Sequence, residues 1–220
     1  MSTPPRHIVL LGFRGHGKVV AEAAVASGRP LVGYCEPAPV PSPIMELPFL
    51  GLESSTLTAG GELVFNGRAF FIGVGDNLRR RRMAESVSRY AVPAVAVVHP
   101  RAYVSASADV AALAFVAAGA LVQAAASIGR GAIVNTGAIV EHDCVVGSFA
   151  HVATGARLAG AVTVGENAFV GAGATVLPGR DIGAGATVGA GATVVRSIPA
   201  GQVWVGTPAR PLSPHPDAAS

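Results

Sequence analysis

Residues 134–158 read VNTGAIVEHDCVVGSFAHVATGARL, and an aliphatic residue returns at every sixth position of this stretch. The same register extends outward in both directions, from Val98 to Val194, without a break. All seventeen positions of the register are Val, Ile or Leu, and four places after each of the first sixteen comes Ala or Cys, except at Val162 and Arg180. If about a third of positions were aliphatic by chance, such a run would have odds on the order of one in a hundred million.

A period of six matches neither an α-helix nor an ordinary amphipathic strand. It fits a coil of three short flat sides, with one aliphatic residue pointing inward from each side and a small residue at each crowded corner. A flexible Ala/Gly linker would have no reason to hold valine in register. The pattern therefore predicts a parallel β-helix of five to six coils, in which residues eighteen apart stack on one side.

The residues before the register predict a small α/β unit. Its expected elements are a strand at His7–Leu11, a glycine turn over residues 12–17, a helix at Val19–Ala26, a strand at Leu31–Tyr34, a loop at Pro37–Pro48, a strand at Phe70–Val74, a helix capped by residues 75–77 and a last strand at Ala94–Val98. In a parallel sheet, ligands bind beyond the carboxyl ends of the strands. We therefore expect Gly15, His16, Glu36 and Asn77 near one mouth.

The turn GFRGHG at residues 12–17 is a natural anion site, because glycines allow close approach and the following helix presents free N–H groups. Its order, GxxGxG, differs from the dinucleotide-binding GxGxxG, so a βαβ unit without a ligand at this turn remains an alternative. We expect an α/β Rossmann-like domain at 1–97, the β-helix domain at 98–210 and a flexible tail at 211–220.

Composition and charge exclude several classes of protein. The net charge is only +3, and the basic run Arg79–Arg82 is interpreted as a solvated helix face, so we expect no nucleic-acid partner. No apolar stretch is long enough to cross a membrane and no signal-peptide pattern follows the first residues. Cys35 and Cys144 match no metal spacing and are interpreted as reduced thiols of a cytoplasmic protein.

Three motifs carry a resemblance that runs nearly the whole chain: GHGKVV at 15–20, EHDC at 141–144 and VGTPAR at 205–210. Together they resemble the hexapeptide-repeat N-acetyltransferases of nucleotide-linked 4-amino-4,6-dideoxy sugars, which are related to the sialic acid O-acetyltransferase-like family. The resemblance implies a left-handed β-helix, acetyl-CoA as the cosubstrate, and a homotrimer with active sites between neighbouring helices.

The resemblance also implies an active-site set. His142 is the expected general base, and an imidazole can accept a proton from the sugar ammonium at neutral pH. Asp143 is expected to orient it, with Glu141 as a competitor. Asn135 belongs to the same set, and the amide of Gly160 is expected near the thioester carbonyl.

Further residues are expected to bind the two substrates. His151 and Gly160 are placed beside the thioester of acetyl-CoA, and Arg210 is placed at a CoA phosphate. The nucleotide sugar is assigned to Gly15, His16, Gly17, Glu36 and Asn77. Relatives that use uridine nucleotides often carry paired aspartates after the second strand, where this chain has only Glu36. We therefore favour a GDP-linked substrate such as GDP-perosamine over a UDP-linked bacillosamine precursor.

Three alternatives remain open from the sequence. One is an O-acetyltransferase acting on a sugar hydroxyl, and another is a non-catalytic solenoid scaffold. The third is a zinc enzyme like the γ-type carbonic anhydrases. His99, His142 and His151 are separated by 43 and 9 residues, which are not multiples of eighteen, so we expect no metal site.

Overall fold

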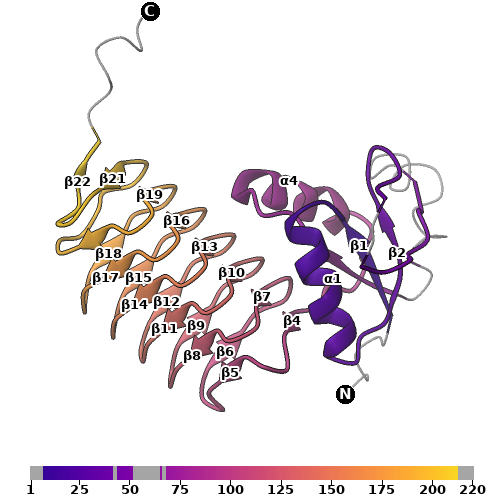
Figure 1. The fold of residues 1–220 in the computed structure, drawn as a ribbon, viewed down its shortest axis with the longest axis horizontal. Coiled ribbons are helices and arrows are strands. Elements are labelled where there is room, and N and C mark those ends of the chain that lie inside the picture. The colour runs from indigo at the N-terminus through magenta and orange to yellow at the C-terminus, as the bar shows by residue number, and fades with distance from the viewer. Residues whose placement is uncertain (1–6, 42–43, 52–64, 66–67, 213–220) are drawn as a thin grey trace, which may run out of the picture.

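The computed structural model describes residues 7–41, 44–51, 65 and 68–212. An α/β unit at the N-terminal end is followed by a long β-helix (Figure 1). This confirms the predicted fold class. No helix among the described residues is long and apolar enough to span a membrane.

The α/β unit has a three-stranded parallel sheet in the order β2-β1-β3. Its elements are β1 (Ile8–Leu11), α1 (His16–Ala26), β2 (Leu31–Cys35), β3 (Ala69–Ile72) and α4 (Asn77–Ser88). Helix α1 begins three residues earlier than predicted, so His16 and Gly17 lie in its first turn. The predicted cap of α4 is confirmed, because the Asp76 carboxylate accepts a hydrogen bond of 2.7 Å from the Arg79 N–H.

Glycines allow the β1–α1 turn to approach its neighbours closely. Gly12 has φ +92°, a conformation that a residue with a β-carbon rarely adopts. A β-carbon on either Gly17 or Gly73 would collide with the carbonyl oxygen of Gly12. The first turn of α1 and the end of β3 can therefore close against the same backbone.

The β-helix is built from two-residue strands, and each coil gives one strand to each of three parallel sheets, here called faces 1, 2 and 3. Face 1 holds β4 (Val97–Val98), β7 (Phe115–Val116), β10 (Ile133–Val134), β13 (His151–Val152), β16 (Phe169–Val170), β19 (Thr187–Val188), β21 (Val203–Val205) and the antiparallel β22 (Arg210–Pro211). Face 2 holds β5 (Tyr103–Val104), β8 (Leu121–Val122), β11 (Ile139–Val140), β14 (Arg157–Leu158), β17 (Thr175–Val176) and β20 (Thr193–Val194). Face 3 holds β6 (Asp109–Val110), β9 (Ser127–Ile128), β12 (Val145–Val146), β15 (Thr163–Val164) and β18 (Asp181–Ile182). The turns between faces form the 1–2, 2–3 and 3–1 edges.

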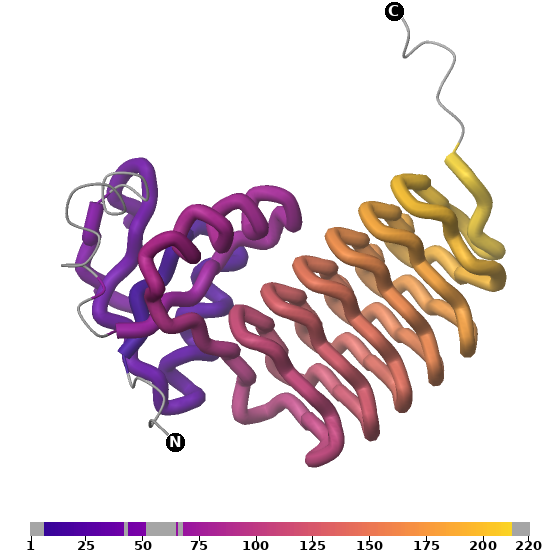
Figure 2. Tube along the Cα trace, turned by 180° about the vertical axis from the view of Figure 1, so that it is seen from behind, coloured from indigo at the N-terminus to yellow at the C-terminus, as the bar shows by residue number. Residues whose placement is uncertain are grey.

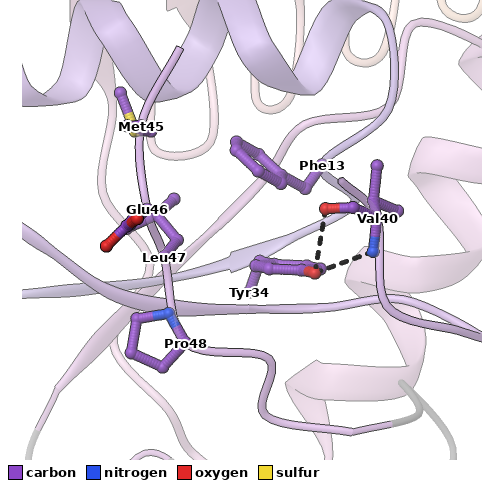
Figure 3. Close-up of a pocket in the computed structure, with 7 residues that line it drawn as sticks. All are labelled: Phe13, Tyr34, Val40, Met45, Glu46, Leu47 and Pro48. Carbon is purple, nitrogen blue, oxygen red and sulfur yellow. Dashed lines mark hydrogen bonds between the residues drawn. The ribbon is translucent and has the colours of Figure 1, made fainter. Parts of the chain in front are cut away.

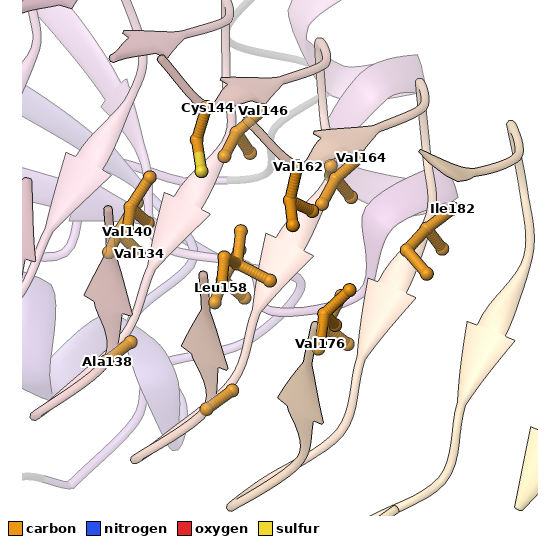
Figure 4. Close-up of a cluster of buried hydrophobic side chains, with 14 of the residues drawn as sticks. Val134, Ala138, Val140, Cys144, Val146, Leu158, Val162, Val164, Val176 and Ile182 are labelled. Atoms are coloured by element: carbon orange, nitrogen blue, oxygen red, sulfur yellow. The ribbon is translucent and has the colours of Figure 1, made fainter. Parts of the chain in front are cut away.

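The core confirms the predicted register. Residues eighteen apart pair on one face, as Val134 does with Val152. The aliphatic side chains and the small corner residues of the central coils fill the interior, and Figure 4 shows Cys144 and Val162 at two such corners. Arg180 remains an exception, since its Nε is buried and has no hydrogen-bond partner among the described residues.

The strand predicted at Ala94–Val98 is divided between the two units. Ala94 makes an isolated parallel bridge to Phe70 of the α/β sheet, whereas β4 pairs with β7 of the β-helix. At the other end, β22 pairs with β21, and the Leu212 N–H donates to the Val203 carbonyl at 2.7 Å. Residues 213–220 of the predicted tail lie outside the described residues.

The two units are in direct contact. Figures 1 and 2 show the α/β unit at the N-terminal end of the β-helix, with α4 directed along it. Side chains of α4 reach the 3–1 edge, where Arg80 contacts Gly131 and Asn77 contacts Asn167. The α/β unit therefore covers one edge of the β-helix.

Candidate active site

His142 and Asp143 form a hydrogen-bonded pair at the 2–3 edge, in the turn between β11 and β12. Nδ1 of His142 lies 2.7 Å from Oδ2 of Asp143, and both side chains are about two-thirds exposed (63% and 62%). Asp143 has φ +60°, which turns its side chain back toward the preceding ring. Among the described residues, the carboxylate that accepts a hydrogen bond from the imidazole belongs to Asp143 and not to Glu141. The carboxylate on Nδ1 leaves Nε2 free to exchange a proton.

Gly160 lies beneath the His142 ring, one coil further along the same edge. A β-carbon on Gly160 would come within 2.5 Å of both Nε2 and Cε1 of His142. The N–H of Gly160 makes no backbone hydrogen bond within the described part of the chain. The missing side chain of Gly160 therefore leaves the space that the His142 ring occupies, and the Gly160 N–H lies beside the ring as a donor.

A second polar pair, Asn135 and His151, lies on face 1 and at the 1–2 edge. Nδ2 of Asn135 is 3.1 Å from Nε2 of His151, and its Oδ1 accepts the Thr136 N–H at 2.8 Å. Because this second bond fixes the amide orientation, Nε2 of His151 is the acceptor and Nδ1 carries the proton. The His151 ring is buried and meets the Phe169 ring edge-on at 5.2 Å.

Burial keeps two histidines neutral. Burial and then the charge of Arg80 lower the pKa of His16 to about 4. The same two causes, followed by the effect of His16, lower the pKa of His151 to about 3, and the Gly75 backbone acts weakly in the opposite direction. The two rings lie 6.2 Å apart. Both are therefore neutral near pH 7.

The structure does not bring the whole predicted set together within one chain. Asn135 and His151 are adjacent, and His142 pairs with Asp143, but face 2 lies between these two groups. Arg210 lies further away, in β22, where its guanidinium donates to the Ala209 carbonyl at 2.8 Å. One chain thus presents two separate polar pairs, His142 with Asp143 and Asn135 with His151.

A cavity of about 200 Å³ lies at the carboxyl ends of β1 and β3. Gly15, His16 and Glu36 line it as predicted, together with Gly75 and Arg79, which the sequence did not indicate. The His16 ring also packs edge-on against Phe115 of β7, at 5.3 Å. His16 therefore joins this cavity to face 1 and His151.

Two of the predicted substrate residues have other contacts. The carboxylate of Glu36 is buried and accepts hydrogen bonds from the Phe13 N–H at 2.8 Å and from Arg14 Nε at 3.4 Å, so it shapes the turn that lines the cavity. Gly17 is not among the lining residues and packs against Gly12 instead.

Asn77, which was expected at the same mouth, does not line this cavity. Its Nδ2 donates to the carbonyls of Asn167 and Ala168, both at 3.0 Å, and its Oδ1 accepts from Arg80 at 2.9 Å. Its side-chain polar atoms are thus engaged between the two units rather than at the mouth of the cavity.

The interpretation of Arg79–Arg82 as a solvated face is wrong for Arg80, which is 1% exposed. The available signal was helical spacing. Arg80, Met83, Ala84 and Val87 form the buried stripe of α4. A charged residue in register with such a stripe indicates a buried contact.

A larger cavity, of about 480 Å³, lies beyond the carboxyl end of β2 (Figure 3). Phe13 and Tyr34 line one side, and Met45, Glu46 and Leu47 line the other. The Tyr34 hydroxyl accepts the Val40 N–H at 2.8 Å and donates to its carbonyl at 3.3 Å, which fixes the loop over the cavity.

Within the described ranges, no group of three His, Cys, Asp or Glu side chains could hold a metal ion. Nδ1 of His99 accepts the Arg101 N–H at 3.0 Å and so stabilises its own turn. The Cys144 thiol donates to the Ala159 carbonyl at 3.1 Å, and burial raises its pKa. A nucleophilic thiolate is therefore disfavoured at this position.

Comparisons with known proteins show which family the chain resembles. The model of the PglD N-terminal domain matches residues 7–87, and the model of the bacterial transferase hexapeptide (six repeats) matches residues 161–196. The chain is similar to the acetyltransferase domain of PglB from Neisseria gonorrhoeae FA1090, with 35% identity, coverage of 94% of this chain and 100% of that chain, and a TM-score of 0.87.

The chain is equally similar to PerB from Caulobacter crescentus, whose structure holds CoA and GDP-perosamine, with 36% identity, coverage of 94% of this chain and 97% of that chain, and a TM-score of 0.87. WeeI from Acinetobacter baumannii AYE, at 22% identity and a TM-score of 0.77 over 93% of this chain and 99% of that chain, shares the fold. Among curated proteins, no match to the chain is found.

The fold and these matches thus define a hexapeptide-repeat acyltransferase. The chain belongs to the PglD-like family of hexapeptide-repeat N-acetyltransferases.

Proposed function

We propose that this enzyme transfers the acetyl group of acetyl-CoA to the 4-amino group of a nucleotide-linked 4-amino-4,6-dideoxy sugar, with GDP-perosamine as the favoured substrate. The observation that carries the proposal is the His142–Asp143 pair, with its 2.7 Å hydrogen bond, lying over Gly160. Two relatives whose structures hold acetyl coenzyme A, or CoA with GDP-perosamine, support the choice of both substrates.

The chemistry follows from this pair. Nε2 of His142 takes a proton from the sugar ammonium, and the free amine attacks the thioester carbon. Asp143 holds the proton of Nδ1 and stabilises the imidazolium that forms. The Gly160 N–H is available to the developing oxyanion. The C–S bond then breaks, the CoA thiolate takes the proton held on His142, and the new amide nitrogen releases its surplus proton to solvent. One sugar ammonium thus yields one amide, one CoA thiol and one proton.

The separation of the two polar pairs supports a homotrimer, in which each pair is one half-site. His142 lies at the 2–3 edge and His151 on face 1, and in a three-fold assembly of prisms the edge of one copy meets the next copy. The thioester is assigned to the junction, between His142 of one copy and His151 with Asn135 of its neighbour. The sugar nucleotide is assigned to the cavity that His16 shares with the same face.

Nucleobase choice is assigned to the larger cavity beyond β2 (Figure 3). Phe13 on one side and Leu47 on the other leave an apolar slot that suits a planar base. The exposed Glu46 side chain offers a carboxylate that can accept the paired N–H donors that guanine has and uracil lacks. This supports a guanine nucleotide. Replacement of Glu46 by Gln should then lower discrimination between GDP- and UDP-linked substrates.

The deciding experiment is a free-thiol release assay with acetyl-CoA against GDP-, UDP- and dTDP-linked 4-amino sugars, each beside its 4-hydroxy counterpart. We expect turnover on a GDP-linked amino sugar and its loss by about a hundredfold or more in His142→Ala. Preference for the hydroxy sugars would indicate an O-acetyltransferase. Absence of turnover on every substrate would refute the proposal.

A further inference from the structure

Arg80 is the largest fully buried side chain among the described residues. Its five guanidinium N–H groups donate to six acceptors, so that one N–H is shared, and every acceptor is an uncharged oxygen. The acceptors are the carbonyls of Gly131 (2.7 Å), Val74 (3.1 Å), Gly75 (2.8 Å), Phe149 (2.8 Å) and Ala150 (3.4 Å), and Oδ1 of Asn77 (2.9 Å). Burial lowers the pKa of Arg80 to about 10, with Asp76 partly offsetting this effect, so the side chain remains a cation at neutral pH.

On the β-helix side, these contacts follow the 3–1 edge. Gly131, Phe149 and Asn167 occupy the same position in three successive coils, each with positive φ (65°, 57° and 56°). Among the described residues, their carbonyls accept no backbone hydrogen bond. Helix α4 covers them, and a covered carbonyl without a donor is costly. Arg80 supplies donors to the first two, and Asn77 supplies a donor to the third.

On the other side, Arg80 holds the β3–α4 turn through Val74 and Gly75. Both residues line the cavity that contains His16. Phe149 and Ala150 immediately precede His151. The same guanidinium therefore binds the wall of the proposed sugar-nucleotide cavity and the turn that carries His151.

We propose that Arg80 is a positioning residue for acetyl transfer, because it fixes the cavity wall at Val74 and Gly75 relative to His151. It thereby sets the distance between the amine of the bound sugar and the thioester. This inference rests on the proposed function.

Lysine cannot replace Arg80, since a single ammonium offers three donors from one point whereas the guanidinium spreads five N–H groups over a plane. The groups that face His151 from the neighbouring elements are His16 on α1 and Arg80 on α4, and the charge of Arg80 favours the neutral form of both rings.

The test compares Arg80→Lys and Arg80→Met with Arg82→Met, which changes an exposed arginine of the same helix. The first measurement is hydrogen–deuterium exchange in peptides covering residues 73–88 and 147–152. The second is steady-state acetyl transfer with both substrates saturating, well below the melting temperature. Calorimetric binding of GDP alone reports on the nucleotide end of the cavity.

We expect Arg80→Lys to keep its circular dichroism, to exchange faster in both peptides, and to lose about tenfold or more in kcat while GDP affinity changes by less than about threefold. Exchange like that of wild type, or a kcat within about twofold of Arg82→Met, would overturn the inference, because a purely stabilising residue lowers Tm and leaves the kcat of the folded enzyme intact. If neither Arg80 variant folds, Asn77→Ala decides by the same two criteria. The exchange measurement does not depend on activity, so failure of the proposed function leaves it interpretable.

Discussion

The His142 imidazole lies directly over Gly160, so closely that a β-carbon on residue 160 would come within 2.5 Å of Nε2. The two residues belong to successive coils of one edge, which means that the place of the proposed base is set by a residue without a side chain.

We therefore expect Gly160→Ala to displace the His142 ring and to lower kcat/KM by about a hundredfold, the usual effect of misplacing a reacting group by an ångström. Gly160 does not have positive φ, so the backbone accepts alanine. The control is the double variant, because in a His142→Ala background the second change should cost little more. Additive losses would show that Gly160 acts independently of His142.

Asp143 and Glu141 make a matched pair for the next measurement. Asp143→Asn keeps the shape but removes the charge beside Nδ1, and we expect kcat to fall by about ten- to a hundredfold, less than for a buried partner because Asp143 is 62% exposed. Glu141→Gln removes a charge of equal size without touching the ring and should stay within about twofold of wild type. A larger loss of kcat in Glu141→Gln than in Asp143→Asn would make Glu141 the orienting acid.

Complementation tests the proposed assembly. His142→Ala and His151→Ala each disable one half-site, so each homotrimer should be inactive. If a site combines His142 of one copy with His151 of the next, unfolding and refolding an equal mixture should restore about a quarter of wild-type activity. Sedimentation checks that trimers have formed. A mixture as inactive as its parents would place both histidines in one chain.

Acid should destabilise the fold through its buried histidines. The pKa values of His16 and His151 are lowered to about 4 and about 3, from 6.5 in the unfolded chain, so below pH 6.5 the unfolded state binds protons that the folded state does not. Stability is complete above this pH and falls as pH is lowered, by on the order of 2 kcal/mol per histidine at pH 5.

Thermal melts between pH 7.5 and pH 5 measure this loss. His16→Asn should flatten the dependence of Tm on pH, whereas His99→Asn, at a turn outside the cluster, should leave it unchanged. An equal slope in wild type and His16→Asn would show that this ring titrates normally in the folded protein.

The β-helix could be predicted from sequence because each coil repeats one packing problem. Val134, Val152 and Val170 stack on one face in successive coils. The need for an inward aliphatic side chain therefore recurs in the sequence at a fixed spacing. The helix start at His16 was missed, because the glycines around it are poor helix formers that close packing against Gly12 requires.

The arrangement of the candidate site residues in space could be predicted only in part. His142 and His151 are nine apart, one and a half hexads, which already places them on different sides of the prism. The contacts of Arg80 lie 51 and 69 residues away and go to backbone carbonyls, which leave no mark on residue identity. Such a contact becomes visible only when the two units are seen together.

The even stacking of the coils gives the β-helix the properties of a ruler. Every contact of Arg80 and Asn77 with the β-helix, and both histidine pairs, fall between residues 131 and 168, whereas Arg210 is carried by strands two coils further on. Each coil advances the chain by about 4.8 Å. Removing eighteen residues beyond Asn167 would bring Arg210 closer to His142 by the spacing of one coil and leave the polar pairs intact. The number of coils is thus a length that selection can adjust separately from the chemistry.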